Sequence, residues 1–365
     1  MILFLIPLLG FILLVIAFMQ QKKFGKHPKG KRLEQIKKSP NYKNGSFQNL
    51  SHTPALTNGA TYYSVLNEFI FAEKKGIKPN GEIPSIKTNL LQLDSKENVL
   101  IWFGHSSYFI QIDGKKILVD PVLSGAASPL SFTTKSFSGT DIYSADDLPE
   151  IDYLFITHDH WDHMDYKTIL KLKSKIKQII CGLGTGEHLE HWGFSKNIII
   201  EKDWNEEIVL ATGFIVNTVP TRHFSGRGFI RNKTIWLSFV FQTPTYKLFL
   251  GGDSGYDNHF SEIGEKFGEF DLVILENGQY NKSWKNIHMM PHEVLLASKE
   301  LKAKKIFPVH SSKFSLSLHN WDEPLKTITE LNKTKKLHLI TPMIGEKVNL
   351  KDDLQQFLEW WTLVK

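Results

Sequence analysis

The sequence has little cysteine: its 365 residues include one, Cys181. A single cysteine excludes an intramolecular disulfide and a metal site made of several thiolates. No segment repeats at the period of a solenoid, and no serine stands in a nucleophile-elbow pattern. With 41% hydrophobic and 22% charged residues, the chain has the composition of a folded protein with a substantial core.

Excess positive charge is confined to one short segment. Residues 22–45 contain nine lysines and arginines but only one acid, Glu34, which gives a net charge of +8. The whole chain carries +6, so the remainder sums to −2. The body therefore lacks the broad basic surface of a polyanion-binding protein, and we expect no nucleic-acid partner.

The first 19 residues carry no charge, and 14 of them are Leu, Ile, Phe or Val. With Gln20 and Gln21 this stretch would reach about 30 Å as a helix, which predicts a transmembrane or anchor helix over residues 1–21. The lysines that follow it place the rest of the chain on the cytoplasmic side. A cleaved signal peptide is the main alternative, although no basic residue precedes the run and no small-x-small site follows it. A buried helix is a further alternative.

Beyond the apolar segment, residues 22–60 are predicted to be a basic, polar linker, and residues 61–365 a folded domain. Asp113-Gly114 joins two apolar runs in the manner of a tight hairpin. Further strand-like runs lie at 98–103, 107–112, 115–119, 153–157, 178–181, 197–201, 206–211, 214–219, 235–241, 247–252, 271–275 and 305–309. Helical periodicity appears near 165–176, 185–192, 258–267, 291–302 and 322–333. This order favours sheets packed on each other and covered by helices.

The strongest functional signal is the sequence THDHWDHMD, which follows a strand and precedes a helix. Alternate side chains of an extended loop point the same way, so His158, His160 and Asp162 can converge, with His163 joining them at the turn into the helix. Imidazoles and a carboxylate are ligands for zinc or a similar divalent ion. Asp159 and Trp161 lie between these residues and are expected to face away or pack.

More ligands are needed for two metal ions, and the candidates stand at strand ends. His223 follows FIVNTVPTR, Asp253 follows KLFLGG, and His310 follows KIFPV. Each residue alone is unremarkable, but the recurrence of a strand, then His or Asp, then a turn favours a shared site. Gly251 and Gly252 would allow a close backbone approach at Asp253.

At these residues the chain resembles the metallo-β-lactamase superfamily. Segments 101–129, 148–165, 251–256, 262–280, 288–293 and 308–314 narrow the resemblance to N-acyl-phosphatidylethanolamine-hydrolysing phospholipase D and its bacterial relatives. The resemblance covers about 95–335. It implies an α+β fold, an αββα four-layer sandwich, with a two-zinc site at one sheet edge; other divalent metals fit the same ligand types.

Carried over by position, the resemblance divides the ligands between the two ions. His158, His160 and His223 would hold one zinc, Asp162, His163 and His310 the other, and Asp253 would bridge both. Asp162, Asp253 and His288 would be the catalytic residues, with His288 near the substrate phosphate. Asp120 would be a supporting aspartate that fixes a histidine tautomer, with an ordinary turn aspartate as the alternative. His105 matches the pattern without an assigned role, and His188 is expected to be structural.

The resemblance implies a phosphodiesterase that hydrolyses N-acyl-phosphatidylethanolamine to N-acylethanolamine and phosphatidic acid, using water activated by two metals. Phospholipid and membrane would be its partners; the sequence leaves a homodimer undetermined. A metal hydrolase of a lactone or soluble phosphodiester is the alternative, and a membrane-anchored scaffold with a vestigial site is another. Arg222, Arg227 and Arg231 are either phosphate contacts or solvated loop charges. Phe224, Trp284 and Trp321 are either groove or core residues. A hydrophobic groove leading to the metals would favour a lipid.

Overall fold

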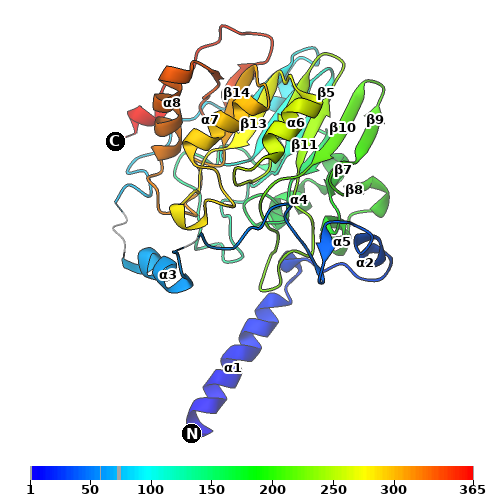
Figure 1. Cartoon of the computed structure of the whole chain (residues 1–365), viewed down its shortest axis with the longest axis vertical. Helices are drawn as coiled ribbons and strands as arrows, with labels where there is room; N and C mark the ends of the chain where they lie inside the picture. The colour runs from blue at the N-terminus through cyan, green and yellow to red at the C-terminus, as the bar shows by residue number, and fades with distance from the viewer. Residues whose placement is uncertain (1, 58, 72–74, 365) are drawn as a thin grey trace.

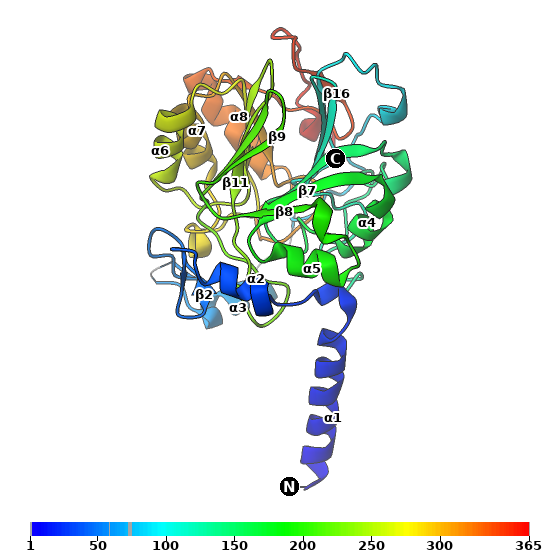
Figure 2. The ribbon, with the colours of Figure 1, turned by 90° about the vertical axis from the view of Figure 1, so that its right-hand side faces the viewer.

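A computed structural model of the chain describes residues 2–57, 59–71 and 75–364. Two sheets pack face to face, and helices cover both outer faces (Figures 1 and 2). The predicted αββα arrangement is therefore confirmed. The hairpin at Asp113-Gly114 is also confirmed, because β4 and β5 pair in antiparallel register with Ile112 opposite Lys115.

The first sheet has seven strands in the order β16-β3-β4-β5-β6-β7-β8. Three pairings, from β16 to β5, are antiparallel, and those from β5 to β8 are parallel. Its strands are β3 (Val99–Trp102), β4 (Tyr108–Ile112), β5 (Lys115–Val119), β6 (Ile151–Ile156), β7 (Ile176–Gly182), β8 (Ile199–Lys202) and β16 (Lys347–Asn349). Since β16 comes from the far end of the chain, this sheet is completed only by the C-terminal region.

The second sheet also has seven strands, in the order β15-β14-β13-β12-β11-β10-β9. It is antiparallel from β9 to β12 and parallel from β12 to β15. Its strands are β9 (Glu207–Ala211), β10 (Phe214–Val219), β11 (Ser238–Gln242), β12 (Lys247–Leu250), β13 (Leu272–Glu276), β14 (Lys305–Val309) and β15 (His338–Leu339).

The largest core lies between the two sheets. Phe155 of the first sheet meets Phe239 of the second with ring centroids 4.9 Å apart, and Trp102 meets Phe307 at 5.9 Å. Burial of these aromatic faces favours the sandwich by removing apolar surface from water. Trp321, one of the candidate groove residues, packs into this core instead.

Helices form the two outer layers, and each layer has its own apolar core. On the first sheet, Ile169 and Leu189 from two helices pack against strand residues. On the second sheet, Phe260, Val294 and Ile328 do the same. The helices are α4 (Tyr166–Lys171), α5 (Thr185–His191), α6 (His259–Phe267), α7 (Pro291–Glu300) and α8 (Glu323–Lys335). The last four are close to the predicted ranges, whereas α4 ends five residues before the predicted end at 176.

The N-terminal helix α1 (Ile2–Met19) projects from the body (Figure 1). Among the described residues, no helix is long and apolar enough to cross a membrane. The transmembrane helix predicted over 1–21 is therefore not supported, and neither is the membrane anchoring inferred from it.

Residues 22–60, predicted to be a linker, lie along the body rather than forming a free tether. Ile36 and Phe47 are fully buried in the main core. Arg32 pairs with three carboxylates, Glu187 at 2.6 Å, Glu190 at 2.5 Å and Glu201 at 2.8 Å. The elements of this region are α2 (Gly30–Ile36), β1 (Tyr42–Lys43) and β2 (Ser46–Phe47), followed by α3 (Tyr62–Phe71). The linker prediction was wrong here because it rested on the local charge and turn-forming residues, which carry no information about these long-range contacts.

Candidate metal centre

The histidine-rich loop follows the C-terminal end of β6, an inner strand of the first sheet, and leads into α4. Asp165 caps α4 by accepting hydrogen bonds from the backbone N–H groups of Lys167 and Thr168, a common way to satisfy the first turn of a helix. Met164 is fully buried beneath the loop. The strand end and the capped helix thus fix both ends of segment 158–163.

Three imidazoles form the first group of candidate ligands. His158 Nε2 lies 2.9 Å from His160 Nδ1, which lies 3.2 Å from His223 Nε2. The Nδ1–H of His223 donates to the carbonyl of Ile287, so its Nε2 presents a lone pair. Burial, together with neighbouring histidines, holds the pKa of His158 well below its usual range. Neutral imidazoles whose lone pairs converge are suited to a cation.

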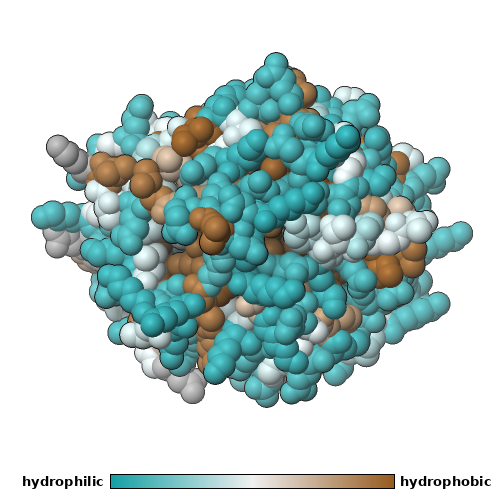
Figure 3. Space-filling view, turned by 90° about the horizontal axis from the view of Figure 1, so that it is seen from above, coloured by the Kyte–Doolittle hydropathy of each residue, from teal (hydrophilic) through white to brown (hydrophobic). Residues whose placement is uncertain are grey.

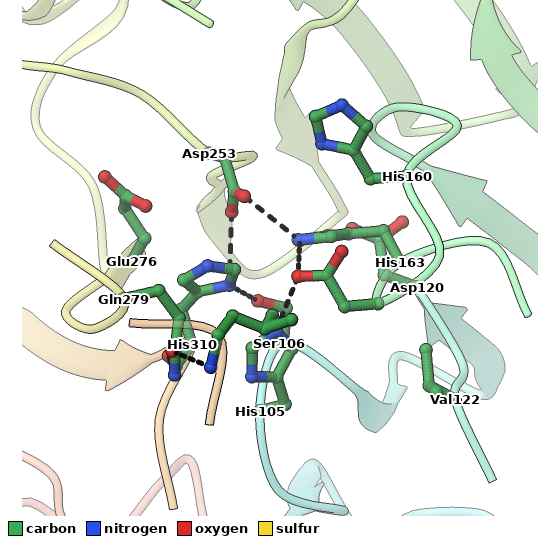
Figure 4. Close-up of polar contacts among 12 residues, drawn as sticks. His105, Ser106, Asp120, Val122, His160, His163, Asp253, Glu276, Gln279 and His310 are labelled. Carbon is green, nitrogen blue, oxygen red and sulfur yellow. Dashed lines mark hydrogen bonds and ion pairs between the residues drawn. The ribbon is translucent and has the colours of Figure 1, made fainter. Parts of the chain in front are cut away.

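Asp162, His163 and His310 form the second group. The Nδ1–H of His163 donates to Asp120, which leaves its Nε2 facing Asp253 Oδ2 at 3.2 Å and Asp162 Oδ2 at 3.5 Å. His310 Nδ1 lies 3.3 Å from Asp253 Oδ1. Figure 4 shows the Asp253 carboxylate between His163 and His310.

Asp253 lies between the two groups. Its Oδ2 is 3.7 Å from His223 Nε2 and 3.8 Å from His158 Nε2, in addition to its contacts with the second group. Burial alone would raise the pKa of this carboxyl, but His163 and His310 hold it well below its usual range. A Cβ on Gly252, just before it, would lie 2.7 Å from the Leu237 carbonyl. Glycine therefore permits the close approach that the sequence predicted.

Metal ions fit this arrangement. Within each group the donor atoms lie within 4.8 Å of one another. His163 Nε2 and Asp253 Oδ1 are buried and have no hydrogen-bond partner. Such atoms are costly to leave unpaired, and a divalent cation would satisfy both. The nitrogen and oxygen donors suit zinc, iron or manganese.

Asp120 lies behind the ligands, where the sequence placed a supporting carboxylate. It accepts hydrogen bonds from His163 Nδ1 at 2.8 Å, from the Thr157 backbone N–H at 2.9 Å and from Thr157 Oγ1 at 2.5 Å. Thr157 Oγ1 also lies 3.0 Å from His158 Nδ1. One buried carboxylate therefore orients a histidine from each group.

We expect Asp120→Asn to weaken metal binding about 10- to 100-fold, the usual effect of losing such a partner. The amide of asparagine keeps the size of the side chain but has one acceptor oxygen in place of two. Its NH2 group would therefore face either the Thr157 backbone N–H or the two donors His163 Nδ1 and Thr157 Oγ1. Metal affinity measured by competition with a chromophoric chelator checks this. Asp152→Asn, a change at a carboxylate that binds the Lys116 backbone N–H on the same sheet, is the control. Wild-type affinity in Asp120→Asn would contradict the assigned role.

The backbone at the site is strained at three positions. His105, Asp120 and His310 have φ values of 53°, 41° and 69°, in the left-handed region that non-glycine residues rarely adopt. Each such residue costs about 1–3 kcal/mol unless its surroundings hold it. Here the His105 and His310 backbones bond to each other, with the His310 N–H donating to the His105 carbonyl at 3.0 Å.

Two further residues belong to the site although the sequence gave them no role. His105 Nε2 lies 2.9 Å from Asp162 Oδ2, so this histidine orients a candidate ligand. Glu276, fully buried at the end of β13, lies 2.5 Å from His288 Nδ1. The sequence pattern that indicated Asp253, a strand followed by a polar residue, also occurs in DLVILE and would have indicated Glu276.

The partly buried His288 and the buried Glu276 form a pair beside the candidate ligands. The His288 ring lies 5.0 Å from that of His223 and 5.2 Å from that of His310. Burial alone would lower the pKa of His288, but the Glu276 carboxylate raises it to about 9. With Nδ1 engaged by Glu276, Nε2 remains for another partner.

Asp159 faces away from the ligands, as expected, but it connects the loop to distant parts of the chain. It lies 3.1 Å from His188 Nε2, and His188 Nδ1 accepts from the Lys26 backbone N–H at 2.9 Å. The buried Arg227 donates to the backbone carbonyls of Asp159 and Met164, each at 2.8 Å, and to that of Lys23 at 3.0 Å. Residues 22–27 thus brace the ligand loop.

These observations define a metal-dependent hydrolase, and the chain belongs to the metallo-β-lactamase superfamily. A family model described as a beta-lactamase superfamily domain matches residues 115–311. An uncharacterized protein of Mycobacterium tuberculosis is 33% identical over 329 residues, 89% of this chain and 88% of its own. The N-acyl-phosphatidylethanolamine-hydrolyzing phospholipase D 1 of Caenorhabditis elegans is 26% identical, covering 78% of this chain and 84% of its own.

The fold is also found in solved structures. A metallo hydrolase from the archaeon Ignicoccus hospitalis superposes with a TM-score of 0.53 at 19% identity, covering 69% of this chain and 97% of its own. At that identity the likeness concerns the fold alone, and it agrees with the αββα architecture.

Proposed function

We propose that this hydrolase is a phosphodiesterase of phospholipase D type. Its substrate would be an N-acyl-phosphatidylethanolamine-like phospholipid of a membrane, and its products an N-acylethanolamine and phosphatidic acid. The candidate ligands would hold two zinc ions, with Asp253 between them. The similarity to the Caenorhabditis elegans phospholipase D 1 supports the reaction type.

An apolar cavity beside the metal ligands carries the proposal. It has a volume of about 430 Å³. Its lining includes the ligand His223, the aromatic residues Phe69, Phe224 and Trp284, and Leu56. A hydrophobic space that leads from the metal site is what an acyl chain requires, and a small polar substrate would leave its apolar walls without a partner.

Arg231 gives the cavity one cation. Its guanidinium lies 4.7 Å from the centre of the Phe224 ring, within range of a cation–π contact. From there it can pair with a phosphate, which arginine binds through two parallel hydrogen bonds. The cavity thus joins an apolar space to a positive group, in keeping with an anionic lipid.

Two divalent ions held by the candidate ligands would supply Lewis acidity and would lower the pKa of water toward neutrality. The side chains of the protein would provide the proton transfer, the orientation of the ligands and the binding of the lipid. His288, whose Nδ1 lies against the Glu276 carboxylate, would donate a proton from Nε2 to the departing lipid oxygen. Asp120 and His105 hold the ligands in position, and the aromatic cavity orients the acyl chain and excludes water.

The test uses the full chain with its metal content measured. Incubation with N-acyl-phosphatidylethanolamine in mixed micelles should release N-acylethanolamine, detected by mass spectrometry. No product from a protein with about two metals per chain would reject the lipid assignment and direct the search to lactones and soluble phosphodiesters.

The cavity predicts a selective effect of Trp284→Ala. Loss of this aromatic wall should raise KM for the long-chain lipid about 10-fold, corresponding to about 1.4 kcal/mol of apolar contact. Hydrolysis of bis(p-nitrophenyl) phosphate, which has no acyl chain, should change little. Leu354→Ala, at an exposed position in the C-terminal segment, is the control. Equal losses of activity on both substrates would show that Trp284 supports the structure of the site and does not contact the acyl chain.

A further inference from the structure

One end of the molecule exposes large apolar side chains on α3. The inner side of this helix packs on the body, where the Phe69 ring stacks on Trp284 with centroids 6.0 Å apart. Its outer side is exposed to solvent, with Tyr63 78% accessible. The exposed apolar residues of α3 are Tyr62, Tyr63, Leu66, Ile70 and Phe71. An exposed apolar surface of this kind is typical of a site that contacts another protein or a membrane.

A neighbouring loop continues this apolar surface toward α1. Phe229 is 82% exposed at its tip, and Ile230 follows. Both line a second cavity of about 400 Å³, which is closed on its other side by Ile16 and Met19 of α1. The same loop supplies Phe224 and Arg231 to the cavity beside His223, whose wall also includes Tyr62 and Phe69 of α3. The active-site cavity therefore lies between two exposed apolar projections.

The views agree on this placement. α1 and α3 lie at the same end of the molecule in Figures 1 and 2. The opposite end, seen from above in Figure 3, is mainly hydrophilic, with apolar residues only in small separate patches. Among the described residues, α1, α3 and the Phe229 loop carry most of the large apolar side chains that are exposed.

Positive charge accompanies this surface. Lys22, Lys26, Lys29 and Lys31 are exposed just after α1. Lys23 lies 4.4 Å from the ring centre of Phe18 in α1. Apolar side chains beside a cluster of lysines match the interfacial layer of a bilayer that contains anionic headgroups.

We propose that α3 and the Phe229 loop dock on the surface of an anionic bilayer and enter its interfacial layer. The inference rests on the proposed function, because docking would serve an enzyme whose substrate is a membrane lipid. In the docked position a lipid could reach the cavity between α3 and the Phe229 loop without crossing water. The docked elements are separate from α1, so the proposal concerns the mouth of the cavity and makes no use of a membrane-spanning helix.

Site-specific fluorescence tests the docking. Cys181 is fully buried, so a cysteine introduced at Leu66, Phe229 or Val209 can be labelled alone with the environment-sensitive dye NBD. The full chain carries Asp253→Asn as well, and the vesicles contain phosphatidylcholine with or without phosphatidylglycerol but no substrate. We expect emission from positions 66 and 229 to shift to shorter wavelength and rise several-fold with phosphatidylglycerol vesicles. Position 209, exposed on β9, should not respond.

Two results would overturn the proposal. Vesicle binding without a response at positions 66 and 229 would mean that α1 alone contacts lipid. A response that appears without vesicles and grows with protein concentration would assign the surface to a second copy of the chain. Neither result bears on the reaction, because hydrolysis is measured separately in mixed micelles with unlabelled protein.

Discussion

Asp253→Asn is expected to abolish hydrolysis, with a loss of about 10³-fold or more, equivalent to about 4 kcal/mol of transition-state stabilisation. The carboxylate faces four histidines through two oxygens, with nitrogen–oxygen distances of 3.2 to 3.8 Å. An amide has the same shape but no charge and only one acceptor oxygen. It cannot bridge two cations, so metal content should fall from about two ions per chain to one or fewer.

Elemental analysis measures the loss of metal from Asp253→Asn, and the hydrolysis assay measures its loss of activity. Asp271→Asn is the matched control, because Asp271 pairs with Lys304 at the protein surface, at the start of β13. Near-ultraviolet circular dichroism should be unchanged in both variants. A scaffold with a vestigial site would show no activity to lose. Full metal content and activity in Asp253→Asn would refute the bridging position.

Arg227→Met should lower the free energy of unfolding by about 3 kcal/mol, a larger loss of stability than we expect from any of the other substitutions. Three backbone carbonyls, of Lys23, Asp159 and Met164, would lose their buried donor, and each unsatisfied group costs about 1–3 kcal/mol. The guanidinium also stacks 4.0 Å from the centre of the Trp161 ring. Burial lowers the pKa of Arg227 to about 10, so it remains charged at neutral pH.

Urea unfolding of the metal-free protein measures this loss, and chelator competition should show weaker metal binding because Asp159 lies within the ligand loop. Arg231→Met removes an arginine four residues away that is exposed, and its stability should stay within about 0.5 kcal/mol of wild type. Equal stability of the two variants would contradict the bracing role of Arg227. Arg227→Lys should lie between, since lysine keeps the charge without the fork of donors.

Local patterns predicted most of the fold. Apolar runs and the Asp113-Gly114 turn correspond to strands, and periodicity located α5, α6 and α7 within two residues at each end. The histidine loop was visible because its ligands are adjacent in sequence. His223, Asp253 and His310 were found from strand ends, since polar residues there gather at one sheet edge.

The remaining features depend on contacts that no local pattern encodes. Arg227 was placed among three loop arginines, and only the fold distinguishes the buried one from Arg231. Glu276 acquires its role from His288, 12 residues away. The region 22–60 looked like a linker because its composition is polar, whereas Arg32 finds its carboxylates some 155–169 residues later.

Those separations have a consequence for synthesis on the ribosome. The groups that bind the backbone of Lys23 and Lys26 and the side chain of Arg32 lie 155–204 residues further along the chain, a length that takes on the order of 10–40 s to translate at about 5–20 residues per second. The first sheet can be completed only later still, because β16 (Lys347–Asn349) must be synthesised before it can pair with β3. During this interval α1 and the lysines after it are outside the ribosome without their folded partners. Any contact that residues 22–32 make in those seconds is therefore made before the ligand loop is braced.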